Sequence, residues 1–186
     1  MERKITYFKD MGIVNTDETL RIVKRRANET GVKTLLIAST YGHTGNKALE
    51  LFGTDYNLIV VGGKREEFPD ELYRNLVDGG HRAGFNSDYD FSYPEMAWDT
   101  LRRFSEGMKV CVEMTLITTD LGILTAGEEV IAVAGTGRYD FKQGGGADTA
   151  ILIEAVRSED FFHFDVPALQ SKKEGRRIKE ILCKPR

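Results

Sequence analysis

Three short apolar runs constrain the fold of this 186-residue chain more than any other feature of its sequence. Residues 35–38, 58–61 and 130–134 are uninterrupted apolar segments, and glycine follows each of them within a few positions. A strand that exposes one face alternates apolar and polar residues, whereas a continuous apolar run is typical of a strand buried on both faces. The three runs therefore predict a largely parallel β-sheet between two layers of helices.

Helical patterns alternate with these runs. Residues 16–30 are predicted to be helical because Asn15 can cap the segment, Glu18 occupies the capping-box position and Gly31 ends it. Residues 108–121 fit both a strand and a helix periodicity, and we favour a helix because glycines bracket the segment. Further helices are expected over 44–52, 69–77 and 94–105, and a weaker strand over 83–86.

The last third of the chain predicts one antiparallel strand. The segment from 135 to 148 separates the strand at 130–134 from a strand at 149–156, and it contains five glycines. A parallel connection needs a crossover helix, which so glycine-rich a segment cannot form, so the strand at 149–156 should run antiparallel to its predecessor. The tail from Arg176 is expected to return as a short edge strand. We therefore predict one α/β domain over residues 1–186 with a mixed sheet.

Composition disfavours several kinds of partner and location. Lys and Arg total 26 against 29 Asp and Glu, and this net charge of −3 gives no electrostatic reason to expect nucleic acid or an anionic membrane. No apolar run approaches the length of about 18 residues that spans a bilayer. The charged N-terminus lacks a secretory signal, so a cytoplasmic location is expected. Cys111 and Cys183 are expected to be buried thiols, and the three dispersed histidines predict no metal site.

The segment that joins the first buried strand to the next helix is a candidate anion site. Free backbone N–H groups, the helix dipole and hydroxyl side chains all meet at such a turn. The pattern is not a Walker loop, because Lys47 stands where the second glycine should be. The alternative is a plain turn capped by Thr44. The predicted phosphate loop consists of Ser39, Thr40, Tyr41, Gly42, His43, Thr44, Gly45 and Asn46.

A second glycine-rich region is expected at the same edge of the sheet, where ligands bind in open α/β folds. It is not a Rossmann fingerprint, because Asp140 stands where the third glycine should be and a strand follows instead of a helix. The two regions are expected to share one pocket, although glycine loops of this length are often only flexible turns. The candidate residues here are Gly135, Thr136, Gly137, Gly146, Asp148 and Thr149.

Glu113 is a further candidate, because a carboxylate in an apolar segment is expected to find partners or to have a perturbed pKa. The alternative for Glu113 is exposure on a helix face. Ser39 has no nucleophile-elbow context, so a hydrolase is not supported. Residues 88–93 are expected to form a packed surface loop or a subunit contact, which leaves a homo-oligomer open.

Five blocks of the sequence, taken in order, resemble a known family: residues 15–20, residues 39–42 with Thr44, residues 109–113, residues 146–149 and residues 178–186. They cover nearly the whole chain and are similar to the small archaeal proteins described as pyruvate kinase C-terminal-domain-like. This resemblance implies a three-layer α/β/α sandwich on a five-stranded mixed sheet with one antiparallel strand.

The resemblance also implies a ligand. The similar domain of pyruvate kinase holds the phosphates of an allosteric sugar bisphosphate, and the stand-alone members look like binders of flavin mononucleotide (FMN). Tyr41 and His43 stand where a basic residue is usual in the kinase effector loop, which suits one phosphate better than two. The flavin ring would then lie towards residues 135–137 and 146–149, with Asp148 and Thr149 at the rim and no side chain at Gly135 to obstruct it.

FMN binding is thus the leading expectation from the sequence. A flavin-dependent oxidoreductase is the first alternative, because a flavin beside Glu113 or His43 could accept hydride. A cofactor-free effector-sensing or assembly domain is the second. Kinase activity is not implied, because a chain of this length has no room for the kinase's catalytic barrel.

Overall fold

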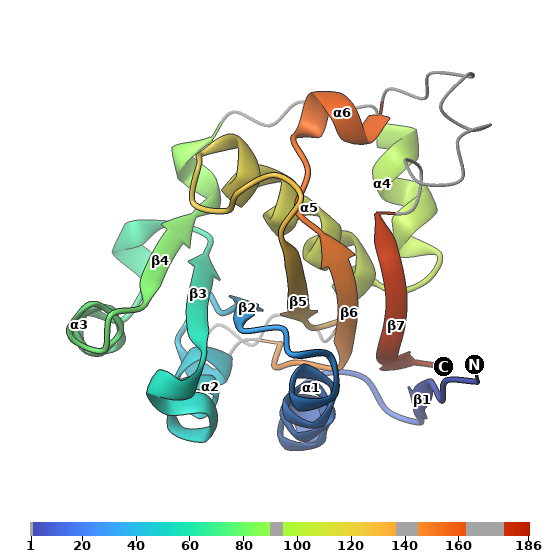
Figure 1. The fold of residues 1–186 in the computed structure, drawn as a ribbon, viewed down its shortest axis with the longest axis horizontal. Helices are drawn as coiled ribbons and strands as arrows, with labels where there is room; N and C mark the ends of the chain where they lie inside the picture. The colour runs from blue at the N-terminus through green and yellow to red at the C-terminus, as the bar shows by residue number, and fades with distance from the viewer. Residues whose placement is uncertain (1, 90–94, 137–144, 163–176) are drawn as a thin grey trace.

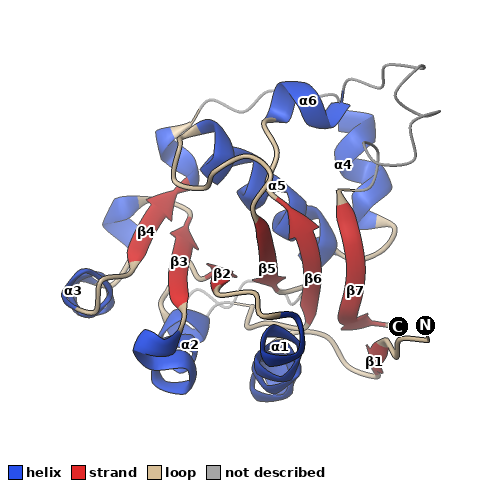
Figure 2. Ribbon diagram, viewed as in Figure 1, coloured by secondary structure: helices blue, strands red, loops and turns tan. Residues whose placement is uncertain are grey.

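Seven strands form one sheet in the order β1-β7-β6-β5-β2-β3-β4 in the computed structural model, which describes residues 2–89, 95–136, 145–162 and 177–186 (Figures 1 and 2). The strands are β1 (Thr6–Phe8), β2 (Thr34–Ala38), β3 (Asn57–Gly62), β4 (Arg82–Phe85), β5 (Glu129–Ala134), β6 (Thr149–Glu154) and β7 (Ile178–Pro185). The longer helices are α1 (Thr16–Thr30), α2 (His43–Phe52), α3 (Asp70–Asp78), α4 (Glu95–Arg102), α5 (Glu106–Asp120) and α6 (Ser158–Phe162).

Helices cover both faces of the sheet, as the continuous apolar runs predict. Figure 2 shows α1, α2 and α3 on one side of the strands and α4, α5 and α6 on the other. Strand β2 illustrates the reason: Leu35 and Ile37 pack in the core beneath α1 and α2, while Leu36 packs in the core beneath α5. All three side chains are fully buried. The three-layer α/β/α arrangement is confirmed.

Strand β6 is the one strand of the described sheet that runs against the others. It pairs antiparallel with both β5 and β7, whereas β2 pairs parallel with β3 and β5, β3 with β4, and β1 with β7. The antiparallel direction predicted from the glycine-rich connection is therefore confirmed. The ambiguous segment at 108–121 is confirmed as helical: it lies in α5, which Ser105 caps by accepting a hydrogen bond from the N–H of Met108 at 2.9 Å.

The expected strand number of five is wrong, since the sheet has seven strands. Strand β1 has only three residues, which is too short to give a periodic sequence signal. The C-terminal tail is also not a short edge strand: β7 has eight residues and lies between β6 and β1. No helix in the described parts of the chain is long and apolar enough to span a bilayer.

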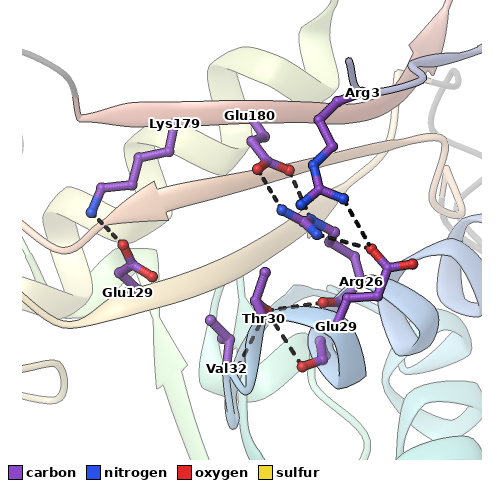
Figure 3. Close-up of polar contacts among 9 residues, drawn as sticks. Arg3, Arg26, Glu29, Thr30, Val32, Glu129, Lys179 and Glu180 are labelled. Carbon is purple, nitrogen blue, oxygen red and sulfur yellow. Dashed lines mark hydrogen bonds and ion pairs between the residues drawn. The ribbon is translucent and has the colours of Figure 1, made fainter. Parts of the chain in front are cut away.

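Arg26 connects α1 to β7 through a bidentate ion pair (Figure 3). Its Nε lies 2.8 Å from Oε2 of Glu180 and its Nη2 lies 2.5 Å from Oε1 of the same carboxylate. Its Nη1 also donates to Glu29 at 2.9 Å. Arg26 is buried, with an exposed fraction of 9%. This pair holds the helix layer against the C-terminal strand.

We expect Arg26→Ala to lower the free energy of unfolding by about 1.5–3 kcal/mol, because it removes charge-assisted hydrogen bonds from a half-buried carboxylate. Urea denaturation followed by circular dichroism measures the change. Arg21→Ala is the matched control, since Arg21 forms an exposed pair with Glu18 and should cost less than about 1 kcal/mol. Equal losses in the two variants would contradict the assigned role of Arg26.

Candidate functional site

A cleft of about 490 Å³ opens at the C-terminal edge of the parallel strands. The chain segments that follow β2, β3, β4 and β5 all contribute to it, and so do the start of α2 and one face of α5. Its volume falls within the range of about 300–1,000 Å³ that is usual for small-molecule sites. The cleft is therefore large enough for a cofactor-sized ligand.

The topology explains why a cleft forms at this place. Strand β2 leads into α2 on one face of the sheet, whereas α5 leads into the neighbouring strand β5 from the opposite face. Connections that diverge from adjacent parallel strands leave a crevice between them, and ligands of open α/β folds bind there. The cleft lies at such a switch point.

The loop after β2 supplies five of its predicted residues to the cleft: Ser39, Thr40, Tyr41, His43 and Thr44. His43 and Thr44 are the first two residues of α2, so their N–H groups have no acceptor within the helix. The N–H of the third residue, Gly45, donates to Oγ of Ser39 at 3.0 Å. Two backbone donors and the positive end of α2 therefore remain at this end of the cleft.

The remaining residues of this loop lie outside the cleft lining and shape the turn. Gly42 has a φ of +89°, and a Cβ there would lie 2.8 Å from Cγ of Pro69. A Cβ on Gly45 would lie 2.8 Å from Cδ2 of Leu72. Asn46 is exposed, and its N–H donates to the carbonyl of Gly42 at 2.8 Å. Both glycines thus permit close packing, and neither could be changed to valine without disturbing the turn.

The second glycine-rich region meets the first at the cleft, because Gly135 and Gly146 also line it. Close packing explains why both positions are glycine. A Cβ on Gly135 would collide with the carbonyl of Gly146, whose carbon would lie only 2.9 Å away. Gly146 has a φ of +68°, and a Cβ there would collide with the backbone of Ile13. Gly137 lies outside the described residues.

Asp148 lies in a buried hydrogen-bond network and is not among the residues that line the cleft, which corrects its expected position at the rim. Its side chain is fully buried and accepts hydrogen bonds from the N–H of Gly12 at 2.6 Å, the N–H of Thr136 at 3.0 Å and Oγ1 of Thr149 at 2.9 Å. Thr149 is equally buried and bonds to Oγ of Ser105 at 3.1 Å. These residues fix the β5–β6 connection to the starts of α1 and α5.

One face of α5 forms a wall of the cleft. Its lining residues include Glu106, Lys109, Val110 and Glu113, whose spacing places them on one side of a helix. Lys109 Nζ lies 2.6 Å from Oε2 of Glu113, and both side chains are largely buried. Lys109 also lies over the ring of Trp98, 5.4 Å from its centroid. Glu113 therefore has a partner, as its apolar surroundings predict.

Two polar atoms of the cleft have no hydrogen-bond partner in the part of the chain that the structure describes. Within the described residues, the buried side-chain atoms without one are Nε2 of His43, Oδ1 of Asn86 and Nε2 of His81, and the first two residues line the cleft. Leaving such an atom unpaired costs about 1–3 kcal/mol. Burial lowers the pKa of His43, the nearby charge of Lys47 lowers it further and Asp17 opposes the shift, so His43 is neutral at neutral pH.

Sequence reasoning missed Asn86 and the role of Lys109. Asn86 directly follows β4, so its position at the end of a predicted strand was the available signal. Lys109 lies four residues before Glu113, a spacing that allows an ion pair on a helix. That spacing could have identified the pair once the segment was taken as helical.

The described residues give little support for a metal site or for a nucleophilic cysteine. They contain no group of three His, Cys, Asp or Glu side chains that could hold a metal ion. Cys111 and Cys183 are buried free thiols, as expected. Burial raises the pKa of Cys111 well above its usual value and that of Cys183 to about 12, so neither is a ready nucleophile.

No family model matches this chain. Two solved structures are similar to it: a pyruvate kinase from Cryptosporidium parvum, with 12% identity and a TM-score of 0.43, and Cryptosporidium parvum pyruvate kinase in complex with ADP, with 11% identity and a TM-score of 0.42. Each match covers 76% of this chain but only 23% and 24% of the respective kinase chain. The chain thus matches about a quarter of those proteins, and at these values the similarity says nothing about its ligand.

Proposed function

We propose that this protein binds one phosphorylated, ring-containing small molecule, FMN, in the cleft, with the phosphate at the start of α2. The observation that carries the proposal is the α2 end of the cleft. There the N–H groups of His43 and Thr44 and the hydroxyl side chains of Ser39, Thr40 and Thr44 gather at the positive end of a helix. A phosphate is the anion that such an arrangement suits.

The charges around the cleft favour a single phosphate. Lys109 is the one Lys or Arg among the described lining residues, and it is paired with Glu113. Glu106 also lines the cleft and is paired with Arg102, whose Nε lies 2.9 Å from Oε2. A bisphosphate would bring two dianionic groups to a lining with so little free positive charge. A helix N-terminus with a partial charge of about +0.5 suits one phosphate.

The rest of the lining suits a flat ring. Val61, Val110 and Met114 contribute apolar side chains, and Gly62 and Gly63 contribute bare backbone at the end of β3. An aromatic ring buries a large apolar area against such surfaces. The combination of a phosphate end and an apolar body is what a mononucleotide-like cofactor requires.

The visible absorption spectrum of freshly purified protein is the first test. We expect a flavin band, or, after removal of any bound ligand, quenching of FMN fluorescence on titration with the protein. Riboflavin is the matched ligand because it has the same ring without the phosphate. We expect FMN to bind about tenfold or more tightly than riboflavin, since each charge-assisted bond to the phosphate strengthens binding. Equal affinities would exclude the phosphate from the site, and no binding of either would favour a cofactor-free domain.

We expect Thr44→Val to weaken FMN binding about tenfold while leaving riboflavin binding unchanged, because the variant loses a phosphate-facing hydroxyl and keeps its shape. Isothermal titration calorimetry measures both affinities. Thr100→Val is the control: Thr100 lies exposed on α4, and its hydroxyl bonds to the carbonyl of Met96. A Thr44 variant that binds FMN as tightly as the Thr100 control would remove this hydroxyl from the site.

A flavin-dependent oxidoreductase is the second candidate function. The observation that favours it is the neutral imidazole of His43 and the paired Lys109 and Glu113 in the same cleft, groups that can hold or pass a proton. Bleaching of bound FMN by a nicotinamide nucleotide under anaerobic conditions would favour this activity. An unchanged flavin spectrum would favour binding alone.

A further inference from the structure

Two unpaired polar atoms in one cleft indicate where a ligand supplies polar groups. Nearly all buried polar atoms of folded proteins are hydrogen-bonded, so each exception calls for an explanation. Oδ1 of Asn86 is buried without a partner among the described residues, and so is Nε2 of His43. Both residues line the proposed FMN cleft. A ligand that reaches both atoms would remove both exceptions.

The two atoms belong to segments that follow different strands of the sheet. His43 begins α2 directly after the loop that follows β2, whereas Asn86 follows β4, and β3 lies between these two strands. Two strand spacings correspond to about 10 Å. A molecule whose phosphate and ring are joined by a five-carbon chain can extend over such a distance. With the phosphate at α2, the far edge of the ring would lie on the β4 side.

The turn that carries Asn86 is held by backbone hydrogen bonds. The N–H of Ser87 donates to the carbonyl of Gly63 at 3.0 Å, and the N–H of Tyr89 donates to the carbonyl of Asn86 at 3.3 Å. Phe85 packs edge-on against Phe68, with ring centroids 5.4 Å apart. The backbone of the turn that carries Asn86 is thus held by the packing of Phe85 and by the neighbouring loop after β3.

We propose that Asn86 determines ligand specificity by recognising the imide edge of the flavin ring, with Oδ1 accepting a hydrogen bond from the ring N–H and the amide N–H₂ donating to an adjacent ring carbonyl. A primary amide presents an acceptor and a donor side by side, which is the complement of an imide N–H and its carbonyl. This inference rests on the proposed FMN site and assigns the ring to the β4 side.

Among the described residues, the side of the cleft formed by the two glycine-rich segments has less space and fewer unpaired polar groups for the flavin ring. The space next to Gly135 is filled by the carbonyl of Gly146. The polar groups of Asp148 and Thr149 are buried and bonded to protein atoms. The sequence-based expectation that the ring faces residues 135–137 and 146–149 is therefore less favoured than an orientation towards Asn86.

The test compares FMN with an analogue methylated at the imide nitrogen, using the wild type and Asn86→Ala. We expect methylation to weaken wild-type binding about tenfold or more, because a site built to accept a hydrogen bond rejects a ligand that lacks the donor. In Asn86→Ala, FMN should bind about tenfold more weakly than in the wild type, and the two ligands should bind with equal affinity. Asn75→Ala is the control, since Asn75 lies exposed on α3.

The outcomes separate this inference from the proposed function. Failure of FMN to bind the wild type would overturn the proposed function itself. FMN binding with no effect of methylation on the wild type would overturn only the role of Asn86, and this measurement needs no variant to fold. A methylation effect that persists in Asn86→Ala would also overturn it, because another residue would then read the imide edge.

Discussion

Alanine in place of Asp148 should lower the free energy of unfolding by about 3–5 kcal/mol. The carboxylate is fully buried and accepts hydrogen bonds from three groups, the N–H groups of Gly12 and Thr136 and the hydroxyl of Thr149. Its removal leaves three donors unpaired, each at a cost of about 1–3 kcal/mol, part of which water entering the space can offset. Urea denaturation followed by circular dichroism measures the loss.

Two further variants make this prediction specific. Asp148→Asn keeps the shape and one acceptor oxygen but places an N–H₂ group among donors. It should lower the free energy of unfolding measurably, but by less than Asp148→Ala does. Asp78→Ala is the control, because Asp78 lies exposed at the end of α3 and should change stability by less than about 0.5 kcal/mol. If Asp148→Ala were as stable as the control, the network would not hold the β5–β6 connection in place.

Gly135→Ala should destabilise the protein by about 3 kcal/mol or more. The added Cβ would collide with the carbonyl of Gly146, which lies in a segment that packs closely beside the backbone of Ile13. Overpacking against backbone atoms is costly because no side-chain rotation relieves it. Thermal unfolding and urea denaturation both report the change.

Gly63→Ala is the matched control for this substitution. Gly63 also lines the cleft, but a Cβ there would meet Glu67 and Thr40 only at 3.6 Å, which is an ordinary contact. A stable Gly135→Ala protein would contradict the packing described for the two glycine-rich segments. A destabilised variant that also loses FMN would report on folding, so substitutions at Gly135 do not locate the ring.

The layer structure could be predicted from the sequence because its cause is local. The continuous apolar runs within β2, β3 and β5 require cover on both faces, and the glycines before β6 exclude a crossover helix. The number of strands could not be predicted. Residues 6–8 form strand β1 by pairing with β7 at the other end of the chain. A three-residue sequence pattern cannot predict such a distant pairing partner.

The position of the cleft could also be predicted. Which polar groups near it already have hydrogen-bond partners within the protein could not. Loops that follow parallel strands meet at one edge, so Ser39 and Gly135 were expected together. Asp148 accepts a hydrogen bond from the N–H of Gly12, which is 136 residues away in the sequence. The N–H of Gly45 donates to Oγ of Ser39. Oδ1 of Asn86 has no hydrogen-bond partner within the described part of the chain. These facts depend on tertiary contacts rather than on local pattern.

The pairing of β1 with β7 bears on the order in which the strands join the sheet. Residues 6–8 pair with residues 183–185, and the N–H of Arg186 donates to the carbonyl of Phe8 at 3.0 Å, so nearly the whole chain separates the partners (Figure 1). Contacts of such long sequence separation carry the greatest loop-closure entropy and form late. During synthesis, β1 therefore has no strand to join until residues 183–185 have been made. We therefore expect β1 to be among the last strands to join the sheet.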